Sequence, residues 1–189
     1  MPPSWAHLTA EYPLPAWPDD FRLVDAPVRN WSERRPPGVA VDCIVIHDTE
    51  TLSVKSVLAT FDNPAEQRSA HYLIDRDGTT YRMVDEAKKA WHAGVSKLGD
   101  RDDVNEFSIG IELMDVDQGP AAVTYTDAQL TTLVALTVDL MLRHLVPLER
   151  VVGHAQIAMP PGRKTDPGRD FPWTDFLVAI DYHASRRRA

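Results

Sequence analysis

The chain of 189 residues has a single cysteine, Cys43, so it cannot form an internal disulfide bond. Cys43 lies within the apolar run VDCIVIH, which predicts a buried thiol that packs as a small hydrophobic residue. Disulfide content therefore gives no indication of an oxidising compartment.

Long hydrophobic runs are also absent, and no segment reaches the unbroken apolar length that a membrane-spanning helix needs. The first residues, MPPSWAHLTAEYPLPAWPDD, lack the basic start and apolar core of a secretory signal. We therefore expect a protein without a membrane segment that is cytoplasmic as synthesised.

Basic residues are outnumbered, with 20 Lys and Arg against 28 Asp and Glu and a formal net charge of −8. A chain of this charge is not expected to bind a nucleic-acid backbone. Residues 183–189 contain three arginines and are expected to form a short, frayed basic tail. We expect a monomer.

The order of secondary-structure elements predicts the fold class. Strands are expected over VDCIVIH and FSIGIELM, a helix over SVKSVLATF, and a hairpin over AHYLIDRDGTTYRMV with its turn at Asp77-Gly78. A capping box of Thr126 and Gln129 begins a long amphipathic helix that ends before Pro147. A short strand, VVGH, and a closing helix, WTDFLVAIDYHA, follow. This order predicts one α/β domain, residues 39–182, with a central mixed β-sheet flanked by helices.

Residues 1–38 contain eight of the 15 prolines and three of the five tryptophans, Trp5, Trp17 and Trp31. Proline removes backbone hydrogen-bond donors and disfavours central strands and helix interiors. We expect an N-terminal arm whose tryptophans pack on the domain.

Two of the expected strands end in histidine, at His47 and His154. Ligands of open α/β sheets gather outside strand ends, so the two imidazoles could meet in one cleft, although a lone strand-end histidine is often structural. Asp166, in the turn RKTDPG, would complete the three protein ligands typical of catalytic zinc. No local spacing signature such as HExxH supports the metal site, so both interpretations stay open here.

Two further residues are candidates for catalysis. Lys164 lies two residues before Asp166, so in an extended segment both side chains point the same way, and a lysine there could stabilise a developing oxyanion. Glu112 shares a strand face with the small residues Ser108 and Gly110, which would leave room for a substrate, and it could act as a general base. A solvent-facing lysine and a solvated carboxylate are the alternatives.

Six blocks in order, IVIHDTE, SAHYLIDRDGT, AWHAGVS, NEFSIGIEL, VVGHAQIA and RKTDPG, resemble the zinc-dependent N-acetylmuramoyl-L-alanine amidases of type 2. That family includes phage lysozyme-amidases and the peptidoglycan-recognition proteins, and the resemblance covers about residues 41–176. It implies one zinc ion per chain held by His47, His154 and Asp166, with Glu112 as acid/base and Lys164 as oxyanion partner. Because no ligand is missing, an enzyme is favoured over a module that only binds peptidoglycan.

The resemblance also suggests residues that contact the substrate. Arg101 precedes the NEFSIGIEL strand, where similar amidases place an arginine that can bind a stem-peptide carboxylate. Trp91 and His92 of AWHAG would line the cleft. His71 of SAHYLI is expected in a wall or structural position rather than as a fourth ligand. Buried or exposed structural roles are the alternative for all four.

The expected reaction is hydrolysis of the amide between the lactyl group of N-acetylmuramic acid and L-alanine. The short linker between IVIHDTE and SAHYLI favours an enzyme that acts on the cell wall itself, including a phage endolysin. Cytosolic recycling of soluble anhydro-muropeptides is the first alternative, and a non-catalytic peptidoglycan-binding module is the second.

Overall fold

The computed structural model describes residues 14–49, 51, 53–114 and 125–188. Six strands form the central sheet in the order β1-β5-β4-β9-β3-β10. They are β1 (Leu23–Asp25), β3 (Cys43–Asp48), β4 (Tyr72–Ile74), β5 (Thr80–Arg82), β9 (Ser108–Leu113) and β10 (Val151–Gly153). Only the β4–β5 pair of this sheet is antiparallel, which confirms a mixed sheet and the expected hairpin.

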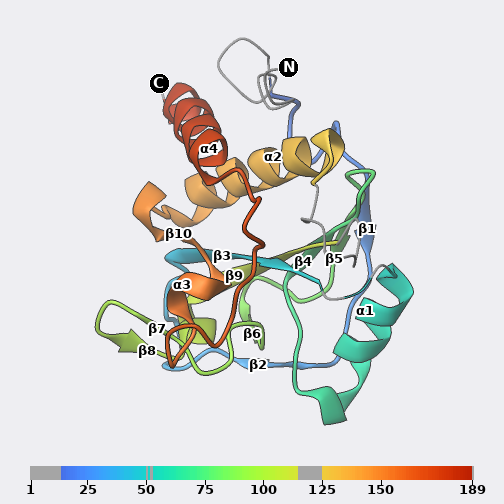
Figure 1. The fold of residues 1–189 in the computed structure, drawn as a ribbon, viewed down its shortest axis with the longest axis vertical. Helices are drawn as coiled ribbons and strands as arrows, with labels where there is room; N and C mark the ends of the chain where they lie inside the picture. The colour runs from blue at the N-terminus through green and yellow to red at the C-terminus, as the bar shows by residue number, and fades with distance from the viewer. Residues whose placement is uncertain (1–13, 50, 52, 115–124, 189) are drawn as a thin grey trace.

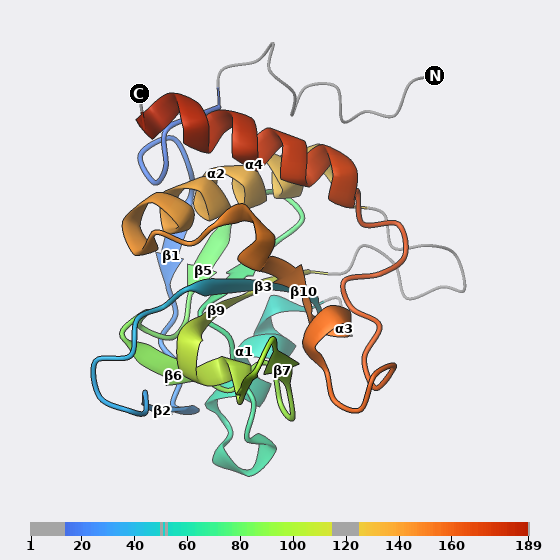
Figure 2. The same ribbon diagram turned by 90° about the vertical axis from the view of Figure 1, so that its left-hand side faces the viewer.

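Two long helices, α2 (Asp127–His144) and α4 (Trp173–Arg188), cover one face of the sheet (Figures 1 and 2). The predicted capping box at the start of α2 is present: the Thr126 side chain accepts from the Gln129 amide, and the Gln129 side chain accepts from the Thr126 amide. Ile44 and Ile46 of β3 and Ile109 and Ile111 of β9 belong to the main core on this side.

The opposite face of the sheet is covered by α1 (Val54–Asp62), α3 (His154–Ile157) and two small two-stranded sheets (Figures 1 and 2). These small sheets pair β2 (Trp31–Glu33) with β6 (Lys88–Ala90), and β7 (Lys97–Leu98) with β8 (Arg101–Asp102). Side chains alternate along a strand, so the residues that follow Ile46 and Ile111, His47 and Glu112, project onto this second face.

The proline-rich N-terminal segment is part of the fold where the structure describes it. β1 is an edge strand of the main sheet, parallel to β5, and β2 pairs with β6. The segment expected to be an arm packed on the domain therefore also contributes two short strands to the sheets. Trp17 packs against the main core as expected, whereas Trp31 is 41% exposed and Trp5 lies outside the described residues.

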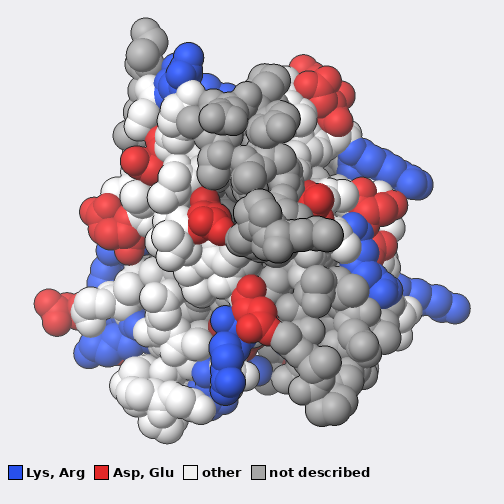
Figure 3. All heavy atoms as spheres, turned by 45° about the horizontal axis from the view of Figure 1, so that its top comes forward, with Lys and Arg blue, Asp and Glu red and all other residues white. Residues whose placement is uncertain are grey.

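The C-terminal tail also differs from the expectation, because residues 183–188 continue α4 rather than fraying. The side chain of His183 is buried and Ala184 packs in the main core, which explains why the helix continues this far. Figure 3 shows acidic and basic side chains interspersed over the described part of the face that it views. None of the helices in the described part of the chain is long and apolar enough to span a bilayer.

Candidate metal centre

The predicted site residues converge on a cavity of about 820 Å³ on the second face of the sheet, at the carboxyl ends of β3 and β9. Its walls include α1, the loop after α1, and the segment that contains Asp166. Seven of the nine predicted site residues line it: His47, Trp91, His92, Glu112, His154, Lys164 and Asp166. His71 and Arg101 are not among the lining residues.

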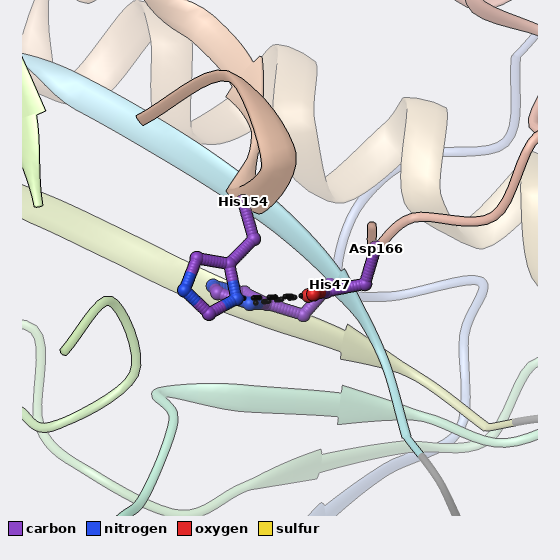
Figure 4. Close-up of side chains that lie close together, drawn as sticks. All are labelled: His47, His154 and Asp166. Carbon is purple, nitrogen blue, oxygen red and sulfur yellow. Dashed lines mark hydrogen bonds and ion pairs between the residues drawn. The ribbon is translucent and has the colours of Figure 1, made fainter. Parts of the chain in front are cut away.

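His47, His154 and Asp166 could hold a metal ion. In the described part of the chain they are the only group of three or more His, Cys, Asp or Glu side chains close enough together to do so. Their ligand atoms all lie within 4.8 Å of one another. The Nδ1 atoms of His47 and His154 lie 3.1 and 3.0 Å from the same oxygen, Oδ2 of Asp166 (Figure 4). Three elements therefore place their donors around one point: β3, the start of α3, and the RKTDPG segment.

The hydrogen-bond partner of His154 determines which ring nitrogen holds the proton. Nε2 of His154 lies 3.1 Å from the carbonyl oxygen of Ala93, which can only accept, so Nε2 is the donor. A neutral ring protonated there has a lone pair on Nδ1. That lone pair faces the Asp166 carboxylate, and two acceptors at this distance repel unless a cation lies between them.

A chain of buried hydrogen bonds determines the tautomer of His47 in the same way. The Ser108 hydroxyl donates to the Val104 carbonyl at 2.7 Å, so its oxygen accepts from Nε2 of His92 at 3.0 Å. Nδ1 of His92 then accepts from Nε2 of His47, also at 3.0 Å. The lone pair of neutral His47 is thus on Nδ1, directed at Asp166. The Val104 carbonyl, in η3 (Val104–Phe107), therefore fixes the orientation of the His47 ring through the side chains of Ser108 and His92.

The electrostatics favour the forms that bind a metal. Burial lowers the pKa of His47, although the neighbouring Asp166 carboxylate acts in the opposite direction; burial also lowers the pKa of His92. Burial opposes ionisation of Asp166, but its contacts with the His154 and His47 rings hold its pKa below the ordinary value. Neutral imidazoles and an ionised carboxylate are the ligand forms that zinc requires. The donor set therefore fits a zinc ion.

Glu112 and Lys164 flank the three predicted ligands. Glu112 is paired with His47 across β9 and β3, on strands that run side by side and parallel. Strands in a sheet lie about 4.8 Å apart, so the two side chains are direct neighbours on the cavity face. Lys164 is half-buried at the cavity wall and close enough to His47 to depress its pKa.

The His92 ring fills the space beside Glu112 on its strand face. The prediction that Ser108 and Gly110 leave room for a substrate there is therefore wrong. Ser108 binds His92, and a methyl group at Gly110 would lie 2.4 Å from Cγ of that ring. The small residues therefore accommodate His92 rather than a substrate. His92 is both a buried cavity wall and the hydrogen-bond partner of His47.

We expect Gly110→Ala to destabilise the protein by about 1–3 kcal/mol, because the new methyl group overpacks against the His92 ring. Denaturant unfolding of the metal-free protein measures this cost. The matched control is the same substitution in a His92→Ala background, where the ring is absent and the cost should largely disappear. An equal cost in both backgrounds would contradict the assignment.

His71 lies behind the cavity rather than in it. It is fully buried, its Nδ1 accepts from the amide of Gly110 at 3.0 Å, and its Nε2 lies near the Lys88 carbonyl and the guanidinium of Arg34. Burial lowers the pKa of His71 to about 3. This geometry supports a structural role for His71, one of the two roles expected from the sequence, and it argues against a contact with the substrate.

Arg101 is placed at the wrong end of the sheet for the predicted substrate contact. Its guanidinium binds Asp42 at 2.6 Å and stacks on the Phe107 ring at 3.5 Å from the centroid. Asp42 precedes the amino end of β3, whereas His47 is near its carboxyl end, roughly 16 Å away at about 3.3 Å per residue. The structure therefore does not bring Arg101 to the cavity.

The sequence did not indicate how the Asp166 segment is held. The Gly168 amide donates to Oδ2 of Asp48 at 2.6 Å and to the Tyr125 hydroxyl at 3.1 Å, and that hydroxyl donates to the same Asp48 oxygen. On the other side, the Ala155 amide donates to the Asp166 carbonyl at 2.8 Å. Polar residues directly after IVIH were the only signal available, since Asp48 is 77 residues from Tyr125 and 120 residues from Gly168.

The chain belongs to the N-acetylmuramoyl-L-alanine amidase family, whose model matches residues 37–169. It is 46% identical over 117 residues to the 1,6-anhydro-N-acetylmuramyl-L-alanine amidase AmpD of Salmonella typhimurium, and 38% identical over 145 residues to AmiD of Escherichia coli. These matches cover 61% and 70% of the chain, but only 59% and 51% of the length of the two relatives.

Solved structures show the same fold. A crystal structure of AmpD superposes with a TM-score of 0.72 at 33% identity, covering 87% of this chain and 96% of that one. Escherichia coli AmiD, solved with the substrate anhydro-N-acetylmuramic acid-L-Ala-D-gamma-Glu-L-Lys, superposes with a TM-score of 0.66 at 29% identity, over 79% and 65% of the two chains.

Proposed function

We propose that the protein hydrolyses the amide bond between the lactyl group of N-acetylmuramic acid and L-alanine, with one zinc ion held by His47, His154 and Asp166. One observation supports this most strongly: the Nδ1 lone pairs of His47 and His154 both point at the same oxygen of Asp166. Glu112 and Lys164 line the same cavity. Family membership supports the same reaction.

The roles of the side chains follow from their positions. A bound zinc ion supplies Lewis acidity that activates water and polarises a carbonyl. Glu112, beside His47, accepts the proton from the attacking water and later donates it to the departing nitrogen of L-alanine. The Lys164 ammonium group stabilises the negative charge that develops on the carbonyl oxygen. His92 holds the His47 ring in the orientation that the ligand requires.

We further propose a soluble anhydro-muropeptide as the substrate. The AmpD relatives named as 1,6-anhydro-N-acetylmuramyl-L-alanine amidases are 41–48% identical to this chain, and the AmiD structure contains an anhydro-muropeptide. These comparisons favour the recycling alternative over the intact wall that the short linker indicated. Linker length is weak support, because surface loops change length at low energetic cost.

The deciding experiment compares two substrates with the zinc-loaded protein: a purified anhydro-muramyl tetrapeptide and purified sacculi. New L-alanine amino termini are measured, with new reducing sugars as a control for glycan cleavage. We expect rapid release from the soluble muropeptide, slow or no release from sacculi, no new reducing ends, and loss of activity after chelation.

Faster release from sacculi would instead support a wall-active enzyme. No release from either substrate, with zinc bound at one ion per chain, would contradict the amidase proposal and favour a module that only binds peptidoglycan.

A further inference from the structure

We infer that residues 29–34, here called the N-terminal strap, position the wall of the cavity that contacts the substrate. The inference rests on the proposed function for the identity of that substrate. The strap lies outside residues 37–169, which the family model matches. It includes β2, which lies beside β6 on the side of the molecule opposite α2 and α4 (Figures 1 and 2).

The wall in question consists of Gln67, Arg68 and Ser69, which follow α1, together with Trp91. Gln67 and Arg68 are exposed, and Gln67 has a left-handed backbone conformation with φ 48°. A non-glycine residue in that conformation is strained unless its surroundings hold it. This part of the wall therefore needs support from elsewhere in the fold.

Asn30 provides that support from beneath. Asn30 is 1% exposed, and its Nδ2 donates to the carbonyls of Asn63 at 2.8 Å and Arg68 at 3.1 Å. One amide group therefore joins the two ends of the turn that contains Gln67. Both protons of the amide are used, and the two carbonyls gain a buried partner.

The strap also holds Trp91. The Ser69 hydroxyl donates to the Asn30 carbonyl, and its oxygen accepts from the Trp91 amide at 3.0 Å. The indole Nε1 of Trp91 donates to the Ser32 hydroxyl oxygen at 3.1 Å. Backbone and ring of Trp91 are thus both anchored through strap residues, and the ring is fixed as a flat apolar wall.

The two ends of the strap explain why it stays in place. Arg29 forms a two-point ion pair with Asp62 at the end of α1, an exposed pair that contributes little by itself. Arg34 is 6% exposed and donates to the carbonyls of Glu86, Asn105, Glu106 and Ser108. The buried guanidinium fastens the strap to η3 and the first residue of β9, and Asn30 and Ser32 contact the residues of the cavity wall.

Two variants test the inference, Asn30→Ala and the milder Ser32→Ala, measured in the full chain with zinc bound. We expect KM for an anhydro-muramyl tetrapeptide to rise about 3- to 10-fold in each, in line with the loss of one or two partly buried hydrogen bonds. Zinc affinity and kcat should stay at wild-type values, because no strap residue contacts the three predicted ligands. Hydrogen exchange of the Arg68, Ser69 and Trp91 amides should become faster in Asn30→Ala.

Thr132→Ala is the matched control. Its hydroxyl is buried and donates to the Gly78 carbonyl at 3.2 Å, far from the cavity wall, so this variant loses a comparable bond. It should lower the melting temperature without changing KM or exchange at the wall. If Asn30→Ala and Ser32→Ala behave like Thr132→Ala, the strap is only a structural element and the inference is overturned.

The exchange measurement separates this inference from the proposed function. A wild-type protein that hydrolyses no muropeptide would contradict the proposed function, while faster wall exchange in Asn30→Ala would still support the strap. Normal hydrolysis with unchanged KM and unchanged wall exchange would overturn the strap alone.

Discussion

Glu112→Gln is expected to lower kcat on the anhydro-muramyl tetrapeptide by about 10²–10⁴-fold, the usual contribution of a general acid–base group. Glutamine has nearly the same shape but cannot accept a proton from water or return it to the departing nitrogen. Glu112 is outside the group of three ligands, so zinc should still bind at one ion per chain. Steady-state kinetics together with metal analysis of the purified variant measure both quantities.

Glu106→Gln is the matched control for this prediction. Glu106 is also a half-buried glutamate of the same region, but it accepts from Lys89 at 2.6 Å and does not line the cavity. Its replacement should leave kcat within about twofold of wild type, a change of roughly 0.4 kcal/mol in the barrier. If Glu112→Gln is as active as Glu106→Gln, Glu112 does not move the proton and the mechanism fails.

Asp166→Ala is expected to weaken zinc binding strongly. Loss of a residue that only hydrogen-bonds to a metal ligand typically costs about 10–100-fold in affinity, and loss of a ligand itself should cost more. The substitution removes the only carboxylate in the group of three, to which both Nδ1 atoms are directed. Competition with a chromophoric chelator measures the affinity, and hydrolysis should fall below detection at equimolar zinc.

Asp170→Ala controls for a change of charge in the same segment, because Asp170 is exposed and does not line the cavity. It should bind zinc as wild type does. Unchanged zinc affinity in Asp166→Ala would mean that the metal is held elsewhere, and the site would have to be reassigned.

Much of the fold was predictable because its signals are local. β3 and β9 are regular apolar strands, the Asp77-Gly78 turn lies in the β4–β5 hairpin, and the capping box marks the start of α2. The short strands β1 and β2 were missed since three residues in a proline-rich segment pair only when β5 and β6 are already placed.

The residues of the candidate site were also predictable from the sequence only in part. The residue types and the order of six motifs indicated His47, His154, Asp166, Glu112 and Lys164, and the structure brings all five to one cavity. The roles of the neighbouring residues depended on packing: His92 occupies the space over Gly110, His71 lies behind it, and Arg101 is held by Asp42 at the far end of β3.

The sequence by itself determined the α/β class, the main strands and helices, and the chemical types of the predicted ligands, since each depends on patterns within one short segment. Only the tertiary structure decided which nitrogen of each histidine faces the carboxylate. For His154 the choice depends on the Ala93 carbonyl, 61 residues away, and for His47 on the Val104 carbonyl, 57 residues away. The tertiary structure likewise showed that Asn30 supports the cavity wall, since hydrogen bonds between distant segments exist only once the chain has folded.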